Sequence, residues 1–291
     1  MAKAILVKGK EKRVQYGHPW IFRSDIDEIV GEFNAGDVVD VYSKRNKFLG
    51  RGYINPKSQI TIRMLTYEHE DINRDFLYRR IRDAWEYRKK VADPNSCRVV
   101  FAESDFLPGL IVDKFADYLV IQTLTLGIDR YKSEIVDILD EIIKPAGMFE
   151  RNDAPVRELE GLDQRKGFLK GKFGTLVEME ENGIKFMVDV ENGQKTGYFL
   201  DQKENRAALK PFVKGAKVLD CFTHIGSFAL HSARYGASEV LGIDISEHAV
   251  ELATNNARIN GLDSNCRFET ANTFDKLREF YDSGESFDVI I

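Results

Sequence analysis

The sequence predicts an α/β protein: a Rossmann-like sheet that is incomplete in this chain, preceded by an all-β domain and an α+β middle domain. An apolar run ending near Asp220 is followed by a glycine turn and an apolar helix, and a second apolar run ends at Asp244. Strand, tight turn, helix and strand are the components of a parallel βαβ unit. Earlier in the chain, helical periodicity marks the middle and short alternating runs mark the start. We expect three domains, over residues 1–67, 68–188 and 189–291.

The first domain is expected to be a small β sandwich or barrel. Short apolar or alternating runs recur there, separated by Gly, Asn and Pro, at residues 4–7, 20–22, 37–42, 48–54 and 59–65. Residues 1–66 carry a net charge of +5, whereas residues 67–185 and residues 186–291 each carry −5. Basic side chains near an aromatic suit RNA, because phosphate attraction and base stacking act together. A solvated basic rim around a core tryptophan would give the same composition. The candidate RNA-binding residues are Lys12, Arg13, His18, Trp20, Arg23 and Arg51.

The middle domain alternates helices with strands. Apolar residues recur at helical spacing over residues 71–91 and again over residues 128–144, where Pro145 ends the pattern. Residues 98–125 are typical of paired strands. Asn182-Gly183 stands between two alternating runs, which is a strong signal for a two-residue hairpin.

Residues 191–206 have two interpretations. Asp201 can cap the helix that follows, with Glu204 completing a capping box. Alternatively, the two glycines and the adjacent Tyr198 and Phe199 can form a lid over the glycine turn. The pattern alone favours the cap.

The glycine turn argues against a dinucleotide. Only Gly226 stands where the dinucleotide fingerprint needs three glycines, and a pyrophosphate requires close backbone approach at a free helix N-terminus. A nucleoside without phosphates requires less, which favours S-adenosylmethionine (SAM) over NAD; a Rossmann-like core with no ligand fits as well. Asp220, Asp244 and Asn272 follow successive strands, so they should share the carboxyl edge where such sheets bind ligands. Asn272 can equally be a helix cap, and we expect Ser246 to cap the helix that follows Asp244.

Composition bears on membrane contact, cellular compartment and metal binding. Hydrophobic residues make up 43% and charged residues 31% of the chain, and no apolar run reaches the roughly 20 residues that span a bilayer. We therefore expect no membrane contact. The three cysteines are odd in number and lack Cys-x-x-Cys spacing, which predicts a reducing, cytoplasmic location and no metal site.

The whole chain resembles the RlmI-like family of SAM-dependent methyltransferases, which form 5-methylcytosine in large-subunit (23S) rRNA. Gly-His-Pro-Trp at residues 17–20 resembles the opening of a PUA domain, a pseudo-barrel that binds RNA. The other matching segments are residues 103–113, 150–153, 157–161, 193–202 and 218–228.

The resemblance implies SAM as cofactor and rRNA as partner, and leaves a homodimer open. It implies that Asp220, Phe222 and Gly226 line the SAM pocket, with Asp244 on the ribose hydroxyls and Asn272 at the adenine. It also implies that Tyr198, Phe199 and Asp201 close the SAM pocket.

One departure concerns catalysis. In the family, the fourth strand leads into an Asp-Pro-Pro loop, and a downstream cysteine attacks the pyrimidine, whereas this chain ends at Ile291. We therefore expect a truncated chain, inactive by itself, whose catalytic residues lie beyond Ile291, with Cys221 a packed core thiol. Two alternatives remain: a SAM methyltransferase acting on another RNA or on a protein, and an RNA-binding protein that transfers nothing.

Overall fold

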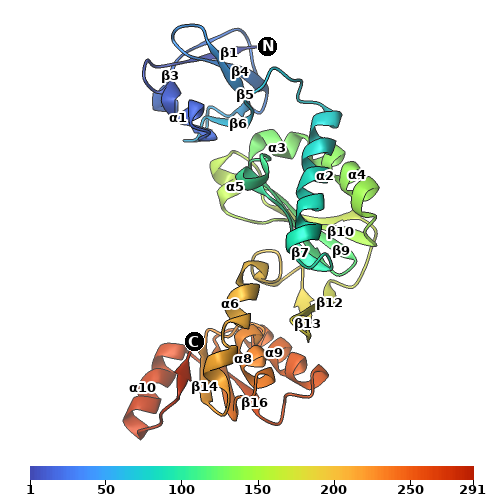
Figure 1. Ribbon diagram of the computed structural model, residues 1–291, viewed down its shortest axis with the longest axis vertical. Helices are drawn as coiled ribbons and strands as arrows, with labels where there is room; N and C mark the ends of the chain where they lie inside the picture. The colour runs from blue at the N-terminus through green and yellow to red at the C-terminus, as the bar shows by residue number, and fades with distance from the viewer. The chain divides into compact units, whose positions relative to one another are not determined.

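The computed structural model describes all 291 residues, which divide into two compact units, Met1–Phe173 and Gly174–Ile291. Figure 1 follows the chain through both. The boundary expected after residue 188 differs from this division, because the hairpin of residues 176–189 lies in the second unit.

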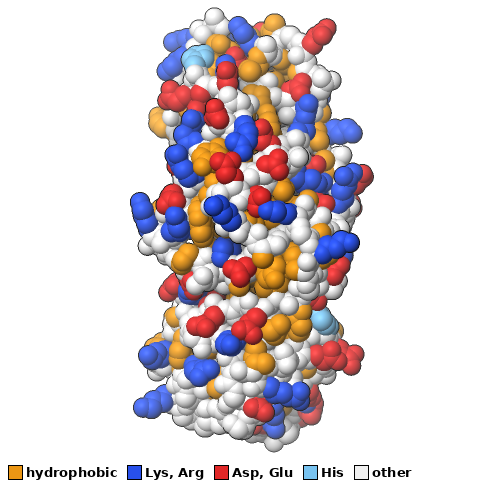
Figure 2. Space-filling view, turned by 90° about the vertical axis from the view of Figure 1, so that its right-hand side faces the viewer, with side chains coloured by type: hydrophobic (Ala, Val, Ile, Leu, Met, Phe, Trp, Pro, Cys, Tyr) orange, Lys and Arg blue, Asp and Glu red, His pale blue; other side chains and the backbone are white.

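The surface is mixed in charge on the face drawn in Figure 2, where Lys and Arg side chains alternate with Asp and Glu and leave small hydrophobic patches between them. None of the helices combines the length and the apolar character needed to cross a bilayer.

The first unit begins with a six-stranded sheet of order β2-β6-β5-β4-β1-β3, in which only β1 and β4 are parallel. Its strands are β1 (Lys3–Leu6), β2 (Trp20–Ile21), β3 (Ile26–Val30), β4 (Val38–Tyr42), β5 (Phe48–Ile54) and β6 (Ile62–Thr66). Helix α1 (Glu11–Gln15) and the 3-10 turn η1 (Arg23–Asp25) flank β2. The five runs expected as strands are confirmed. The sequence reading missed α1 and β3, which are five residues long each, too short for a clear period to show.

The rest of the first unit is a five-stranded sheet of order β11-β10-β9-β8-β7 with helices packed on it. Its strands are β7 (Ser96–Phe101), β8 (Leu110–Phe115), β9 (Tyr118–Thr123), β10 (Gly147–Asn152) and β11 (Arg165–Lys170). Its helices are α2 (Arg74–Val91), η2 (Ala102–Asp105), α3 (Leu126–Arg130), α4 (Lys132–Ile143) and α5 (Val156–Leu159). The expected helix over 128–144 is two helices, α3 and α4, which meet at Tyr131.

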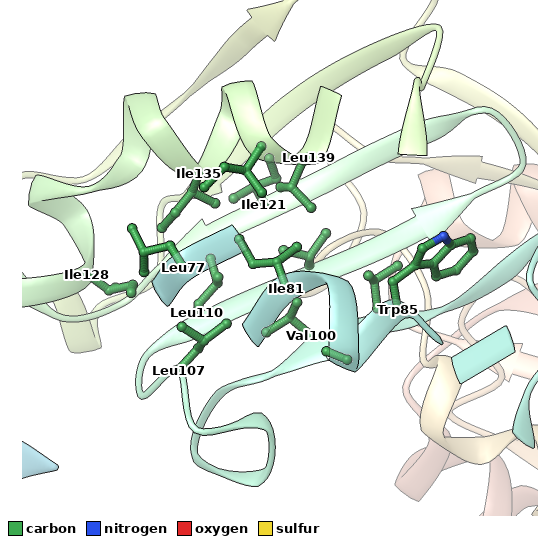
Figure 3. Close-up of a cluster of buried hydrophobic side chains, with 14 of the residues drawn as sticks. Leu77, Ile81, Trp85, Val100, Leu107, Leu110, Ile121, Ile128, Ile135 and Leu139 are labelled. Carbon is green, nitrogen blue, oxygen red and sulfur yellow. The ribbon is translucent and has the colours of Figure 1, made fainter. Parts of the chain in front are cut away.

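The apolar stripe predicted on α2 is confirmed as core. Figure 3 shows Leu77, Ile81 and Trp85 of α2 beside side chains of the sheet and of α4, such as Ile121 and Leu139. This core is the reason that α2 keeps its charged residues on the outside.

A buried carboxylate joins the two sheets of the first unit. Glu160 accepts hydrogen bonds from Asn55 Nδ2 (2.9 Å), Ser58 Oγ (2.6 Å) and Arg63 Nη2 (2.9 Å), and only 2% of the residue is exposed. Burial by itself would raise the pKa of Glu160, but the hydrogen bonds from Ser58, Asn55 and Arg63 outweigh burial and hold that pKa below its usual value. The ionised carboxylate is therefore the form that the fold stabilises.

The second unit contains a hairpin and a parallel sheet. The hairpin pairs β12 (Leu176–Glu181) with β13 (Ile184–Asp189) around Asn182 and Gly183, as expected. Backbone groups of β13 bond to helix α9 (Glu247–Ile259) and to its C-cap residue: Met187 N donates to Asn256 Oδ1 (2.8 Å) and Lys185 N to Asn260 Oδ1 (2.9 Å). These bonds explain why the hairpin belongs to the second unit.

The parallel sheet has the order β16-β15-β14-β17, the doubly wound arrangement in which the first strand lies in the middle. Its strands are β14 (Lys217–Cys221), β15 (Glu239–Asp244), β16 (Cys266–Thr270) and β17 (Val289–Ile290). The helical elements are η3 (Leu200–Gln202), α6 (Lys203–Ala207), α7 (Lys210–Val213), α8 (Ser227–Arg234), α9 (Glu247–Ile259) and α10 (Thr273–Ser283). The expected cap of α9 by Ser246 is confirmed, since its side chain accepts from Ala249 N.

The capping box expected at Asp201 is wrong. Asp201 lies inside the 3-10 turn η3, and α6 begins after Gln202 without a side-chain cap. A capping residue needs an extended backbone, which a residue already in a helical turn lacks.

The Glu160 cluster gives a stability prediction. Glu160→Ala leaves Arg63 buried without its closest carboxylate, so we expect the free energy of unfolding of the first unit to fall by about 3–5 kcal/mol at pH 7. The matched control is Glu141→Ala, which removes an exposed ion pair with Arg74 and should cost less than about 1 kcal/mol.

Acid titration of the same variants tests the pKa. Because the folded-state pKa of Glu160 is lowered, its contribution is complete above the unfolded pKa of about 4.3 and is lost as the pH falls below that value. Denaturant unfolding at several pH values should show the wild type approaching Glu160→Ala in acid. A difference that stays constant down to pH 3 would contradict this account.

Candidate functional site

Three polar strand ends meet at one edge of the parallel sheet, as the sequence predicted. Asp220 is at the end of β14, Asp244 ends β15, and Asn272 follows β16. The three strands are parallel neighbours in the order β16-β15-β14. Their carboxyl ends therefore form one candidate site.

Asp244 is held in place and keeps acceptor capacity. Its Oδ2 accepts from His224 N (2.9 Å) and its Oδ1 from Ser246 N (3.0 Å), and 8% of the residue is exposed. An ionised carboxylate offers about four acceptor positions, so about two are left. Those positions suit a pair of hydroxyl groups on a ligand.

Asp220 organises the turn that follows β14. It is buried, and its Oδ2 accepts from Thr223 Oγ1 (2.5 Å) and Ala229 N (3.0 Å). Burial raises the pKa of Asp220 to about 7, although those two hydrogen bonds oppose the rise. Asp220 thus ties the glycine turn to the first turn of α8, and its expected place at the SAM pocket stays a prediction.

The turn between β14 and α8 is strained. Phe222 has φ +59°, His224 has φ +53°, and Gly226 has φ +82°. Non-glycine residues with positive φ are uncommon and cluster at functional sites. At Gly226 a Cβ atom would come within 2.8 Å of the Phe268 ring, so packing as well as backbone conformation requires glycine there.

Exposed apolar side chains border this edge. Phe222 is 61% exposed, and its ring lies edge-to-face with the ring of Phe274 at 5.8 Å between centroids. Ile245, which follows Asp244, is 74% exposed. The sequence reading missed Ile245 and Phe274, although each stands one or two residues after a polar strand end that it had identified. These apolar side chains suit a flat, weakly polar ring.

Asn272 is the N-cap of α10. Its Oδ1 accepts from Phe274 N (3.0 Å) and Asp275 N (3.4 Å). The cap interpretation is confirmed. Since the oxygen is engaged by the helix, the amide NH₂ is the group left for a ligand, and it can only donate.

The segment expected to close the site is anchored by a buried ion pair. Arg206 Nε and Nη2 bond to the two carboxylate oxygens of Glu181 (2.6 and 3.0 Å), and Arg206 Nη2 also donates to Phe199 O (2.8 Å). Tyr198 OH donates to the same carboxylate (3.1 Å), and Tyr198 is only 1% exposed. Tyr198 and Arg206 are therefore buried, and the Arg206 guanidinium lies 5.5 Å from the ring centroid of Phe228, two residues after Gly226.

Phe199 is the aromatic of this segment that reaches the site. Its ring lies 5.7 Å from the His224 ring, edge-to-face, with Lys195 Nζ 4.3 Å from its centroid. Burial lowers the pKa of His224, so this ring is neutral near pH 7. Asp201 is exposed and has no described contact with the strand ends.

The thiols of the second unit are not activated. Burial, and then the nearby carboxyl of Asp220, raise the pKa of Cys221, and burial raises the pKa of Cys266 to about 12. A thiol is nucleophilic as the thiolate, so neither is poised to attack. The structure contains no group of three His, Cys, Asp or Glu side chains arranged to hold a metal ion.

Comparison with known proteins extends over the whole chain. Residues 4–67 match a PUA-like domain, and residues 212–291 match a methyltransferase domain. The ribosomal RNA large subunit methyltransferase I of Vibrio vulnificus (strain CMCP6) is 40% identical over 299 residues, covering 100% of this chain and 75% of that protein. The protein of the same name from Tolumonas auensis is 39% identical over 293 residues, covering 98% of this chain and 74% of that one.

Solved structures agree on the fold. A protein of Streptococcus mutans described as a SAM-dependent methyltransferase superposes with a TM-score of 0.85 at 21% identity, covering 100% of this chain and 76% of that one. A protein described as a methyltransferase in complex with SAH superposes with a TM-score of 0.86 at 21% identity, covering 100% and 75%.

The raised pKa of Asp220 gives a prediction. The folded state keeps this proton up to about pH 7, whereas an unfolded aspartate loses it near pH 4. The unfolded state therefore binds fewer protons between these values, and this group's contribution to stability falls as the pH rises from 4 to 7. Asp220→Asn cannot titrate, so the second unit of this variant should lose up to about 4 kcal/mol less than the wild type over that range.

Denaturant unfolding at pH 4.5 and pH 7.5 measures the difference. The amide retains an oxygen that can accept from Thr223 and Ala229, so the variant should fold. Equal pH dependence in the wild type and in Asp220→Asn would show that Asp220 is already ionised in the folded protein.

Proposed function

Because this chain belongs to the ribosomal RNA large subunit methyltransferase I family, we propose that it methylates large-subunit ribosomal RNA at carbon 5 of a cytosine. It is a SAM-dependent methyltransferase with a PUA-like domain at its start. The observation that carries the proposal is the edge of the parallel sheet, where the Asp244 carboxylate keeps free acceptor positions and exposed apolar side chains lie beside it. The chain also matches these relatives over 98–100% of its length.

The residues at this edge fit the nucleoside part of SAM. The two remaining acceptor positions of Asp244 suit the ribose hydroxyls, and the Phe222 and Phe274 rings suit the adenine. The amide of Asn272 can donate to a ring nitrogen, since its oxygen caps α10. The bound cofactor supplies the methyl group. Phe199, whose carbonyl Arg206 holds, is placed to cover the site and exclude water.

Methylation at carbon 5 sets a further requirement. Carbon 5 of cytosine becomes nucleophilic when a thiolate adds at carbon 6. Neither Cys221 nor Cys266 has a lowered pKa, so we assign the attack to neither. The chain spans 74–75% of the length of these relatives.

RNA contact is assigned first to the PUA-like domain. Of the six candidates, Lys12, Arg13 and Arg23 present exposed charge. Arg51 bonds to Asp40 (2.7 Å) and Asp71 (3.0 Å), which neutralises it, so we assign it no phosphate.

Two candidates are also tied to neighbours. His18 Nε2 is 3.0 Å from Arg13 Nη2, and Trp20 Nε1 donates to Glu103 Oε1 (2.8 Å). Trp20 thus joins the first sheet to η2. This structural role explains the tryptophan at this position without a stacked nucleobase, so we assign it no RNA contact. We retain His18 as a contact that acts together with Arg13.

Product mapping tests this proposal. The purified enzyme is incubated with labelled SAM and unmodified large-subunit rRNA, with small-subunit rRNA as the matched control. We expect label in the large-subunit RNA alone, recovered as 5-methylcytosine after digestion to nucleosides. Label in another nucleoside or in protein would show that the substrate is not a cytosine of large-subunit rRNA. RNA binding without methyl transfer would show that the protein is not catalytic.

A further inference from the structure

Phe106 lies in a costly conformation that burial does not explain. It ends η2 with φ +57° and ψ +31°, in the left-handed region, and 51% of the residue is exposed. A side chain larger than glycine is disfavoured there, most of all a bulky one. Such residues persist where the surroundings hold them, and they concentrate at ligand sites.

The Phe106 ring borders a hollow between η2 and α2. The hollow has a volume of about 190 Å³ and is lined by Arg80, Asp83, Ala84, Tyr87, Ser104, Asp105 and Phe106. A cavity of roughly 150 Å³ accommodates benzene, so this hollow has room for one flat ring. Tyr87 is 56% exposed and supplies a second aromatic wall.

Arg80 supplies the one positive charge among the residues that line the hollow, which also include Asp83 and Asp105. The Arg80 guanidinium lies 5.0 Å from the Phe106 ring centroid, and its nearest carboxylate, Glu70, is 4.0 Å away. Arg80 Nε and Arg88 Nη1 are buried without a hydrogen-bond acceptor. The two acids of the lining are neutralised, Asp83 by Arg82 (2.8 Å) and Asp105 by Arg88 (2.7 Å).

Helix α2 adds to this positive charge. It carries seven basic and three acidic residues, a net charge of +4 within a chain whose net charge is −5. A polyanion is therefore favoured beside the hollow.

The η2 loop is rigid. Asp105 Oδ2 accepts from Arg88 Nη2 (2.7 Å) and from Phe101 N (2.6 Å), which fastens η2 to α2 and to the end of β7. Leu107 N donates to Ala102 O (3.0 Å) and closes the turn. The backbone that carries the ring is therefore fixed before any ligand binds, which lowers the entropic cost of binding.

We propose that this hollow binds an unpaired nucleotide of RNA, with the base stacked on Phe106 beside Tyr87 and the phosphate near the basic residues of α2. The inference rests on the proposed function, which makes RNA the substrate, and adds a second RNA contact outside the PUA-like domain. Single-stranded RNA is bound in this way, by aromatic platforms beside basic grooves. A protein partner fits less well, because two half-exposed rings supply far less than the roughly 800 Å² per side of a stable interface.

The test uses the purified 291-residue chain and two RNA probes, a single-stranded 12-nucleotide oligocytidylate and a duplex of the same length, with binding followed by fluorescence anisotropy. Phe106→Gly removes the ring and relieves the backbone. We expect its thermal unfolding midpoint to be unchanged or higher, and its affinity for the single strand to fall roughly 5- to 150-fold, the range of one stacked base. Duplex affinity should change little.

Two more variants distinguish the effect of an aromatic stacking face from the effect of side-chain size. Phe106→Leu keeps an apolar side chain without an aromatic face and should also lose affinity, whereas Phe106→Tyr should retain it. The matched control is Tyr281→Ala, which removes an aromatic that is 86% exposed in the second unit and should bind as the wild type does.

Each outcome decides the question. If Phe106→Gly and Phe106→Leu bind the single strand as tightly as the wild type, the stacking site is wrong and the proposed function stands. If Phe106→Gly is less stable than the wild type while binding is unchanged, the ring is a packing element. If the wild type binds neither these probes nor large-subunit rRNA, the proposed function fails together with the inference.

Discussion

The buried carboxylate of Glu181 is the constraint on which the second unit depends. It closes the hairpin strand β12 and takes two bonds from Arg206 and one from Tyr198. A carboxylate so deeply buried is stable only when it is paired and hydrogen-bonded, so the segment that carries Tyr198 and Arg206 has to fold back onto the hairpin. Arg206 then fixes the Phe199 carbonyl, and thereby the position of the aromatic beside His224.

Two further carboxylates, Asp220 and Asp244, lie on adjacent strands and have different roles in the site. Asp220 is enclosed, its pKa is raised by burial, and it organises the turn from Thr223 to Ala229. Asp244 is also largely buried, at 8% exposed, but it is held by two backbone N–H groups that leave it free acceptor positions. The same residue type thus shapes the loop at one strand end and can receive a ligand at the next.

The sequence predicted the elements and strand ends that depend on a few neighbouring residues. It missed the contacts between residues that are far apart along the chain. The stripe of α2, the Asn182-Gly183 hairpin, the Ser246 cap and the strand ends at Asp220 and Asp244 each follow from a few neighbouring residues. The bond between Glu181 and Arg206 joins residues 25 positions apart, and no local signal reports it. For the same reason local pattern predicted a capping box at Asp201, although the structure places that residue inside η3.

The central claim is that SAM binds at the carboxyl edge of β14, β15 and β16 through Asp244. Calorimetric titration of S-adenosylhomocysteine into wild type, Asp244→Asn and Asp263→Asn tests it, because Asp263 is an exposed aspartate of the same unit. Asn keeps one acceptor but loses the charge, and charge-assisted hydrogen bonds are worth roughly 1.5–3 kcal/mol. We expect Asp244→Asn to remain folded and bind at least tenfold more weakly, with Asp263→Asn unchanged. Equal affinity in all three folded proteins would contradict the account.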